Sequence, residues 1–197
     1  MKVLAATTNK GKIQEISDIL ARAGVSIVSL AELGLTLDVI EDGETFEENA
    51  IKKATAFRDA AGIPALADDS GLCVDALGGA PGVYSARYAG PSANDQDNIK
   101  LLLERLAGIP ERKAHFVCVA ALALTDGRVI TGRGEFEGVI IDTPRGSGGF
   151  GYDPVFLDPV TGKTFAELSR DEKNRMSHRH RALEALKENL IRSASAV

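Results

Sequence analysis

The sequence has few cysteines, no long apolar run and no excess of basic residues, and each absence excludes a class of protein. Its two cysteines, Cys73 and Cys118, lie in apolar surroundings, which indicates buried thiols in a reducing compartment and no disulfide framework. Their spacing does not fit a zinc site. No apolar segment reaches the length of about 20 residues that spans a bilayer, and the N-terminal apolar stretch is too short for a signal peptide.

Charge and composition are those of an ordinary globular protein. The 197 residues are 44% hydrophobic and 26% charged, with a formal net charge of −5. This balance argues against a general surface for nucleic acid, although a local basic pocket is compatible with it. Because no repeat, low-complexity segment or linker is evident, we predict a soluble, cytoplasmic, single-domain protein over residues 1–197, with no nucleic-acid or membrane partner.

Two adjacent carboxylates in the middle of the chain are the most informative feature. Asp68 and Asp69 precede Ser70 and Gly71 and stand between short apolar runs. Like-charge repulsion makes such a pair costly unless a proton or a cation compensates it. We expect a strand end or tight turn to fix both side chains, and a hard divalent cation to be their partner.

A strand, a polar loop and a helix are predicted in succession at the N-terminus. Residues 3–6 are apolar, residues 7–12 read Thr-Thr-Asn-Lys-Gly-Lys, and Ile13, Ile16 and Ile19 then share one helical face. Such a loop can present N–H groups and a lysine to a phosphate. The alternative is a strand–helix turn with a solvated lysine. The common P-loop is excluded because its leading glycine is missing and Ile13 replaces Ser or Thr.

An acidic segment, residues 38–48, opens a second helix. Thr45 and Glu48 fit a capping box, and apolar residues then follow at helical spacing. Glu41 precedes the helix, so capping does not explain it. Glu41 is either a solvated residue of an acidic loop or a further carboxylate for a metal site.

In the second half of the sequence, we predict a loop at residues 78–88 and a helix at 94–106. Residues 114–124 are almost continuously apolar, which predicts a strand that is buried on both faces. Asp126 and Gly127 form a hairpin signal, so we predict that residues 128–134 return as the partner strand and that residues 136–141 continue the sheet.

A glycine-rich loop with two aromatic residues follows the predicted sheet. Four glycines between positions 146 and 151 permit close approach of the backbone to a ligand. Phe150 and Tyr152 offer a stacking surface for a base, while Asp153 either hydrogen-bonds a sugar or base or begins a turn before Pro154. A flexible surface loop is the alternative. We favour a ligand site because only 5% of the chain is aromatic.

Basic residues gather near two C-terminal helices. A capping box at residues 169–172 opens a short helix that carries Lys173, and residues 177–181, Ser-His-Arg-His-Arg, begin the last helix. Cations at a helix N-terminus oppose the helix dipole, which favours an anion partner for His178 and Arg179. Solvated basic residues are the alternative. These cations, the carboxylates and the aromatic loop together suit a nucleoside triphosphate with magnesium.

Six blocks of the chain resemble the inosine/xanthosine triphosphate pyrophosphatase family, in its bacterial dITP/XTP branch. They occur in the family's order and cover nearly the whole chain: residues 7–12, 45–50, 67–72, 77–88, 148–154 and 177–179. One departure is Thr8, where bacterial members often have glycine. The resemblance implies a two-lobed α/β fold with a long mixed sheet flanked by helices, an active site in the cleft between the lobes, and a homodimer.

The same resemblance implies Mg²⁺-dependent hydrolysis of ITP, dITP and XTP to monophosphate and pyrophosphate, which removes deaminated purines from the nucleotide pool. It implies Asp69 as proton acceptor and metal ligand, with Glu41 as second metal ligand. The implied substrate contacts are Thr7, Thr8, Asn9, Lys10, Gly11, Lys12, Ser70, Phe150, Gly151, Tyr152, Asp153, Lys173, His178 and Arg179. Alternatives are a non-catalytic nucleotide sensor and a pyrophosphatase of related fold that acts on other modified nucleotides.

Overall fold

The computed structural model describes residues 2–21 and 25–195, and the chain divides into two compact units. Unit 1 comprises Met1–Asp69, Cys118–Gly134 and His178–Val197, and unit 2 comprises Ser70–Val117 and Glu135–Ser177. Six strands form a mixed sheet in the order β2-β1-β3-β4-β5-β6. The predicted mixed α/β class is confirmed, and the single domain over 1–197 stays a prediction.

The elements follow one another in an order close to the predicted one. They are β1 (Lys2–Ala5), α1 (Lys10–Ala21), β2 (Ser26–Ser29), α2 (Phe46–Ala61), β3 (Ala65–Val74), α3 (Asp95–Arg105), β4 (Lys113–Ala123), β5 (Val129–Ile140), β6 (Phe156–Leu157), α4 (Arg170–Met176) and α5 (His178–Ser195), with two 3₁₀ helices, η1 (Asp75–Leu77) and η2 (Gly82–Arg87), between β3 and α3. The predicted polar loop is shorter than expected, because the helix already begins at Lys10.

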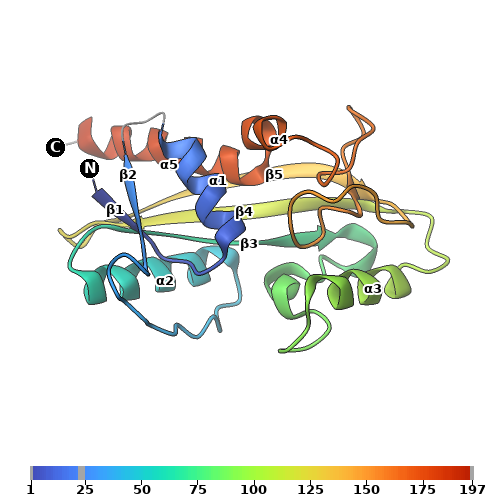
Figure 1. Ribbon diagram of the computed structural model, residues 1–197, viewed down its shortest axis with the longest axis horizontal. Helices are drawn as coiled ribbons and strands as arrows, with labels where there is room; N and C mark the ends of the chain where they lie inside the picture. The colour runs from blue at the N-terminus through green and yellow to red at the C-terminus, as the bar shows by residue number, and fades with distance from the viewer. Residues whose placement is uncertain (1, 22–24, 196–197) are drawn as a thin grey trace. The chain divides into compact units, whose positions relative to one another are not determined.

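Unit 1 is built on parallel strands with helices on both faces. β1 pairs in parallel with β2 on one side and with β3 on the other. Figure 1 shows α1 and α5 on one face of these strands and α2 on the opposite face. On the first face, Ile16, Leu66 and Leu183 belong to one apolar core. On the second face, α2 buries Ala50 and Ala54 of its apolar stripe.

The two central aspartates lie inside a strand, not at its end. β3 is a continuous strand of ten residues, so the prediction of a strand end or tight turn at Asp68 and Asp69 is wrong. The sequence pattern misled because a strand interior is normally apolar, whereas both aspartates here are buried, with 3% and 6% of their surface exposed. Successive strand residues point to opposite faces, so the two carboxylates serve different sides of the sheet.

Unit 2 has an aromatic core. The rings of Phe116, Phe136, Phe156 and Phe165 contact one another, with centroids 4.4–6.3 Å apart. Helix α3 packs against this core through residues such as Leu102. In the part of the chain that the structure describes, no helix is both long and apolar enough to cross a membrane.

Several local predictions are confirmed in atomic detail. Capping boxes open α2 at Thr45 and α4 at Ser169, with reciprocal hydrogen bonds to Glu48 and Glu172. The β4–β5 hairpin turns at Gly127, whose φ of 91° suits glycine. Each of these signals is short-range, which is why the sequence alone predicts it.

Close packing of α5 on β5 depends on two glycines. A Cβ at Gly132 would lie 2.2 Å from the backbone N of Leu186, and one at Gly134 would lie 2.3 Å from the backbone O of His178. No side chain can be accommodated at either position without moving the helix. This contact fixes the helix that carries His178 and Arg179.

We predict that Gly134→Ala lowers the free energy of unfolding by about 1–3 kcal/mol or more, because an added methyl group must push α5 away from the strand. Urea unfolding measures the change. Glu137→Ala, at an exposed position of the same strand, is the control and should have a much smaller effect. Equal stability of wild type and Gly134→Ala would contradict the role assigned to this glycine.

Candidate functional site

The candidate site of unit 1 begins where β1 ends and β3 continues. In the parallel register, Ala5 of β1 pairs with Leu66, so Asp68 and Asp69 extend beyond the carboxyl end of β1. The chain that leaves β1 enters α1, whose N-terminus is capped by the Asn9 side chain accepting from the Lys12 N–H, at 3.1 Å. Carboxyl ends of parallel strands are common ligand sites in α/β proteins.

Asp68 faces α1 and α5 and holds cations from both helices. Lys12 Nζ of α1 lies 3.1 Å from Asp68 Oδ2, and Arg179 Nη2 of α5 lies 3.1 Å from the same oxygen. The guanidinium also contacts Glu15 through Nη1. Arg179 is 1% exposed, so these carboxylates surround a fully buried charge.

The electrostatics of Asp68 favour its charged form. Burial alone would raise the pKa of Asp68, but the charges of Lys12, Arg179 and Lys53 outweigh it and hold the pKa well below its usual range. The Cys118 thiol, with Sγ 3.8 Å from Asp68 Oδ2, is also buried, and burial raises its pKa to about 12. The prediction of a buried thiol is confirmed for Cys118, whereas Cys73 is half-buried.

Asp69 faces the opposite side of the sheet and meets α2. Asn49 Nδ2 donates to Asp69 Oδ2 at 3.1 Å, and Lys53 Nζ lies 3.8 Å from Asp69 Oδ1. Lys53 also donates to Glu41 Oε2 at 3.0 Å and to the backbone O of Asp68 at 2.8 Å. One ammonium group therefore links Glu41 and Asp69.

Asn49 ties Asp69 to the loop that carries Glu41. Its Oδ1 accepts from the backbone N of Gly43 at 2.8 Å while its Nδ2 donates to Asp69. A Cβ at Gly43 would lie only 2.8 Å from that oxygen, so the loop needs a glycine there. Because Asn49 is 1% exposed, this double hydrogen bond is shielded from water.

Burial raises the pKa of the Asp69 carboxyl, although Lys53 and Lys12 lower it in part, and nearby Glu41 raises it further. The two neighbouring aspartates thus have pKa values displaced in opposite directions. Groups displaced in this way are typical of acid–base sites.

Glu41 and Asp69 supply a donor set that fits a hard divalent cation. Within residues 2–21 and 25–195, no group of three or more His, Cys, Asp and Glu side chains is arranged to hold a metal ion. Magnesium needs fewer protein ligands than that, because one or two carboxylates usually hold it together with water and substrate phosphates. The carboxylates of Glu41 and Asp69 already share one cation, the Lys53 ammonium.

A second polar cluster lies in unit 2, at the glycine-rich loop. Asp153 Oδ2 accepts from Lys173 Nζ at 2.6 Å and from the backbone N of Phe150 at 2.9 Å. The ammonium also stands over the Phe150 ring, 4.8 Å from its centroid. A Cβ at Gly149 would lie 2.0 Å from Asp153 Oδ2, so this loop can close around the carboxylate only with glycine at that position.

The remaining predicted substrate contacts have varied environments. Tyr152 is 4% exposed and belongs to the core of unit 2, where its hydroxyl donates to the backbone O of Ser85. Its ring is therefore no stacking surface, and Phe150 alone of the two can fill that role. The Gly151 N–H donates to Asp95 Oδ2 at 2.7 Å. Ser70 is half-buried, and His178 is buried at the start of α5.

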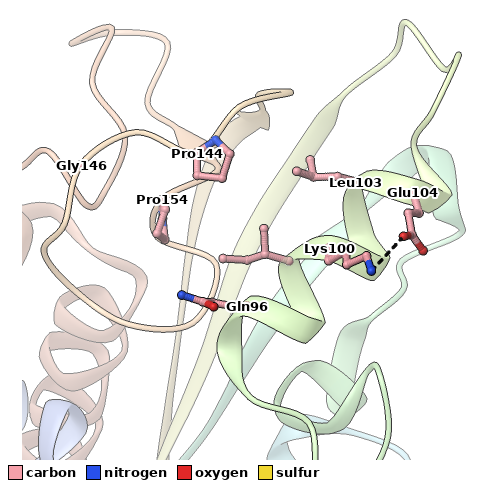
Figure 2. Close-up of a pocket in the computed structure, with 8 residues that line it drawn as sticks. Gln96, Lys100, Leu103, Glu104, Pro144, Gly146 and Pro154 are labelled. Carbon is pink, nitrogen blue, oxygen red and sulfur yellow. Dashed lines mark ion pairs between the residues drawn. The ribbon is translucent and has the colours of Figure 1, made fainter.

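Unit 2 also has an open hollow of about 700 Å³ between α3 and residues 144–154 (Figure 2). Its lining is mainly apolar, with Ile99 and Leu103 on the helix side. Lys100, which also lines it, lies 3.9 Å from Glu104, and Figure 2 shows this pair. The hollow offers no cluster of charges suited to phosphates, so the polar clusters are the better candidates.

Sequence reasoning missed Glu15, Asn49 and Lys53. A signal for the last two was present, since positions 49 and 53 fall one turn apart on the apolar face of α2. Polar residues on the buried face of an amphipathic helix need a partner, which indicates a functional or structural role. No comparable signal marked Glu15, whose partner Arg179 is 164 residues away.

The fold and these clusters define a mixed α/β protein in which the carboxylates of Glu41 and Asp69 suit a divalent cation. The sequence model of the Ham1 family matches residues 3–189, and the chain belongs to this family. A protein of Geobacter sulfurreducens named dITP/XTP pyrophosphatase is 51% identical over 96% of each chain. One of the same name from Thermus thermophilus is 52% identical, over 95% of this chain and 91% of its own.

Solved structures agree with this assignment. The Ham1 protein of Staphylococcus aureus is 41% identical and superposes with a TM-score of 0.86, over 98% of this chain and 100% of its own. A HAM1 protein of Coxiella burnetii is 42% identical with the same TM-score, over 98% of this chain and 99% of its own. The resemblance inferred from the six sequence blocks is thereby confirmed.

We predict that Asp69→Asn raises the free energy of unfolding of the metal-free protein at pH 7. The raised pKa means that the folded state disfavours charged Asp69, and the amide removes that penalty while still accepting from Asn49. The gain should shrink as the pH falls through the raised pKa, because wild-type Asp69 then binds a proton. Urea unfolding at pH 7 and at lower pH measures both effects.

Asp68→Asn is the matched comparison and should have the opposite sign. The charged form of Asp68 is stabilised in the folded state, and the amide of the variant leaves the buried Arg179 with one counter-charge fewer. We therefore expect the free energy of unfolding to fall by about 3–5 kcal/mol at pH 7. Destabilisation by both substitutions would contradict the different environments assigned to the two aspartates.

Proposed function

We propose that this protein hydrolyses inosine, deoxyinosine and xanthosine triphosphates to the nucleoside monophosphate and pyrophosphate, removing deaminated purines from the nucleotide pool. The main support is the cluster of Glu41, Lys53 and Asp69, in which two carboxylates suited to a metal ion share one ammonium group beyond the carboxyl end of β1. Membership of the Ham1 family and relatives named dITP/XTP pyrophosphatase at about 50% identity support it further.

In this proposal Asp69 accepts a proton from the attacking water, and its burial beside Asn49 keeps the carboxylate oriented. In the metal-free chain, burial raises the pKa of the Asp69 carboxyl. Phosphate oxygens bind Lys12 and the backbone at the N-terminus of α1, residues 7–12, where N–H groups and the helix dipole favour anions.

Glu41 and Asp69 would hold Mg²⁺, with Ser70 adjacent as a substrate contact. When bound, the ion would neutralise phosphate charge and lower the pKa of a bound water. Among the chain's own groups, Asn49 orients Asp69 and holds the loop of Glu41 through Gly43. These contacts preorganise the carboxylates before any ligand arrives.

Base contacts are proposed for Phe150, Gly151, Tyr152, Asp153 and Lys173 in unit 2. His178 and Arg179 are expected as further substrate contacts, but Arg179 is 1% exposed and pairs with Asp68 and Glu15, so its proposed role is to hold Asp68. Phe150 stacks on the base, and Tyr152 contributes backbone contacts and support from the core. A donor aimed at a 6-oxo group is left unpaired by adenine, which costs about 1–3 kcal/mol. The buried Asp153 carboxylate holds the ammonium of Lys173 in place, and we assign Lys173 as the donor to the 6-oxo group.

A cytoplasmic location and a homodimer complete the proposal, because the nucleotide pool is cytoplasmic and the family resemblance implies a dimer. A non-catalytic nucleotide sensor would bind triphosphate but release no pyrophosphate. A related pyrophosphatase with another base preference would release pyrophosphate from a different set of nucleotides.

We predict that the wild-type protein with Mg²⁺ releases pyrophosphate from dITP and XTP much faster than from dATP and dGTP. Asp69→Asn should lose about 100-fold or more of turnover while keeping its fold, since a general base contributes at least that much. A coupled pyrophosphate assay, with and without Mg²⁺, measures both. Binding of dITP without pyrophosphate release would favour the sensor and refute the enzyme.

We also predict that Phe150→Ala lowers kcat/KM for dITP by about 5- to 150-fold, because stacking of a base on an aromatic ring is worth roughly 1–3 kcal/mol. Phe150→Tyr keeps a ring and should stay within a few-fold of wild type. Steady-state kinetics with both variants test this. An equal loss in the two variants would indicate that the loop, and not stacking, limits binding.

A further inference from the structure

Lys53 has an unusual set of partners for a lysine. Its side chain is 11% exposed, and its ammonium lies 3.0 Å from Glu41 Oε2, 2.8 Å from the backbone O of Asp68 and 3.8 Å from Asp69 Oδ1. Three oxygens from two segments thus surround one positive charge. Two of them belong to the side chains assigned to the metal, Glu41 and Asp69.

A cation in this position competes with a metal ion for the same carboxylates. A lysine ammonium is a compact point charge at the end of a flexible four-carbon stem, so it can reach the carboxylates or withdraw while α2 stays in place. Asn49, one turn earlier on α2, holds Asp69 and Gly43 by separate hydrogen bonds. The Asp69 carboxylate and the loop that carries Glu41 therefore each keep a hydrogen bond that does not involve Lys53.

We propose that Lys53 occupies the place of the metal ion in the metal-free protein and moves from the carboxylates to a triphosphate oxygen when substrate arrives. The inference rests on the proposed function, since it takes the Glu41–Asp69 pair as the metal site. The substrate's phosphates attract the ammonium, which frees the carboxylates for the cation. Metal and triphosphate then bind cooperatively, and by linkage each increases the affinity of the other.

The ion pairs around Asp68 and Asp69 are consistent with this exchange of Lys53 for a metal ion. The cations that contact Asp68 and Asp69, namely Lys12, Lys53 and Arg179, each lie within ion-pair distance of a carboxylate. Arg179 is buried between Asp68 and Glu15, on the other face of the strand from Asp69. Lys53 alone of these three contacts both proposed metal ligands, so it is the one whose removal changes the metal site directly.

The test measures binding of Mn²⁺ alone to the metal-free full chain, by calorimetry or electron paramagnetic resonance, with no nucleotide present. Lys53→Met removes the competing charge, so we expect Mn²⁺ to bind about tenfold tighter or more than to wild type, given the strength of charge interactions at such distances. Lys53→Arg keeps a cation and should not tighten binding.

Lys52→Met is the matched control. Lys52 is the neighbouring lysine of α2, is largely exposed, and pairs with Asp42 of the same acidic loop. This substitution removes the same charge from the same helix but removes no contact to Glu41 or Asp69. The affinity for Mn²⁺ should therefore change by less than about threefold. If Lys53→Met does not fold, Lys53→Gln replaces it, because the amide is neutral and can still donate to the Asp68 backbone.

Unchanged or weaker Mn²⁺ binding in the neutral Lys53 variants, including no measurable binding, would overturn the proposal. Lys53 would then be a structural partner of the carboxylates, not a competitor. Pyrophosphate release from dITP and XTP by the wild type is measured in parallel. Tighter Mn²⁺ binding without any hydrolysis would refute the proposed function alone, whereas hydrolysis without tighter binding would refute the exchange alone.

Discussion

The neutralisation of buried Asp68 is the interaction on which unit 1 most depends. Asp68 is 3% exposed in a strand interior, and the free-energy cost of burying its charged carboxylate there would be prohibitive without counter-charges. Lys12 of α1 and Arg179 of α5 supply them, so one side chain joins a strand to two helices. Removing any partner leaves a buried charge with fewer counter-charges, which makes the three groups interdependent. The N-terminus of α1 and the start of α5 are thereby held at the candidate site.

Alternation along β3 turns one dipeptide into two different chemical groups. Asp68 lies among cations on one face and remains charged, whereas Asp69 on the other face has its pKa raised by burial. Neighbouring carboxylates with different environments can take different roles, one structural and one as a base or metal ligand. A tight turn at this point would have directed both toward the same cation and made their pKa values interdependent.

Short-range signals predicted much of the fold, and long-range contacts account for what was missed. The capping boxes at Thr45 and Ser169 and the turn at Gly127 need only neighbouring residues, and the structure has all three. The strand through Asp68 is stabilised by Arg179, 111 residues away, which no local pattern reveals. For the candidate site, the sequence indicated the carboxylates and the glycine loop. It did not indicate Asn49 and Lys53 of α2, which contact the carboxylates of Asp69 and Glu41.

Each unit contains a lysine with a buried ammonium that pairs with a carboxylate, and stability does not explain these pairs well. In unit 2 Lys173 pairs with Asp153, and in unit 1 Lys53 pairs with Glu41. Desolvating two charges costs as much as their attraction returns, so well-packed apolar residues would serve folding at least equally. A pair that can exchange partners with an anionic ligand has a use that an apolar contact lacks. Gly149 lies against the Asp153 carboxylate, has a φ of 73°, and leaves no room for a Cβ. Glycine loses more conformational entropy on folding than other residues, so this position also costs stability, and the ion pair is the feature that requires it.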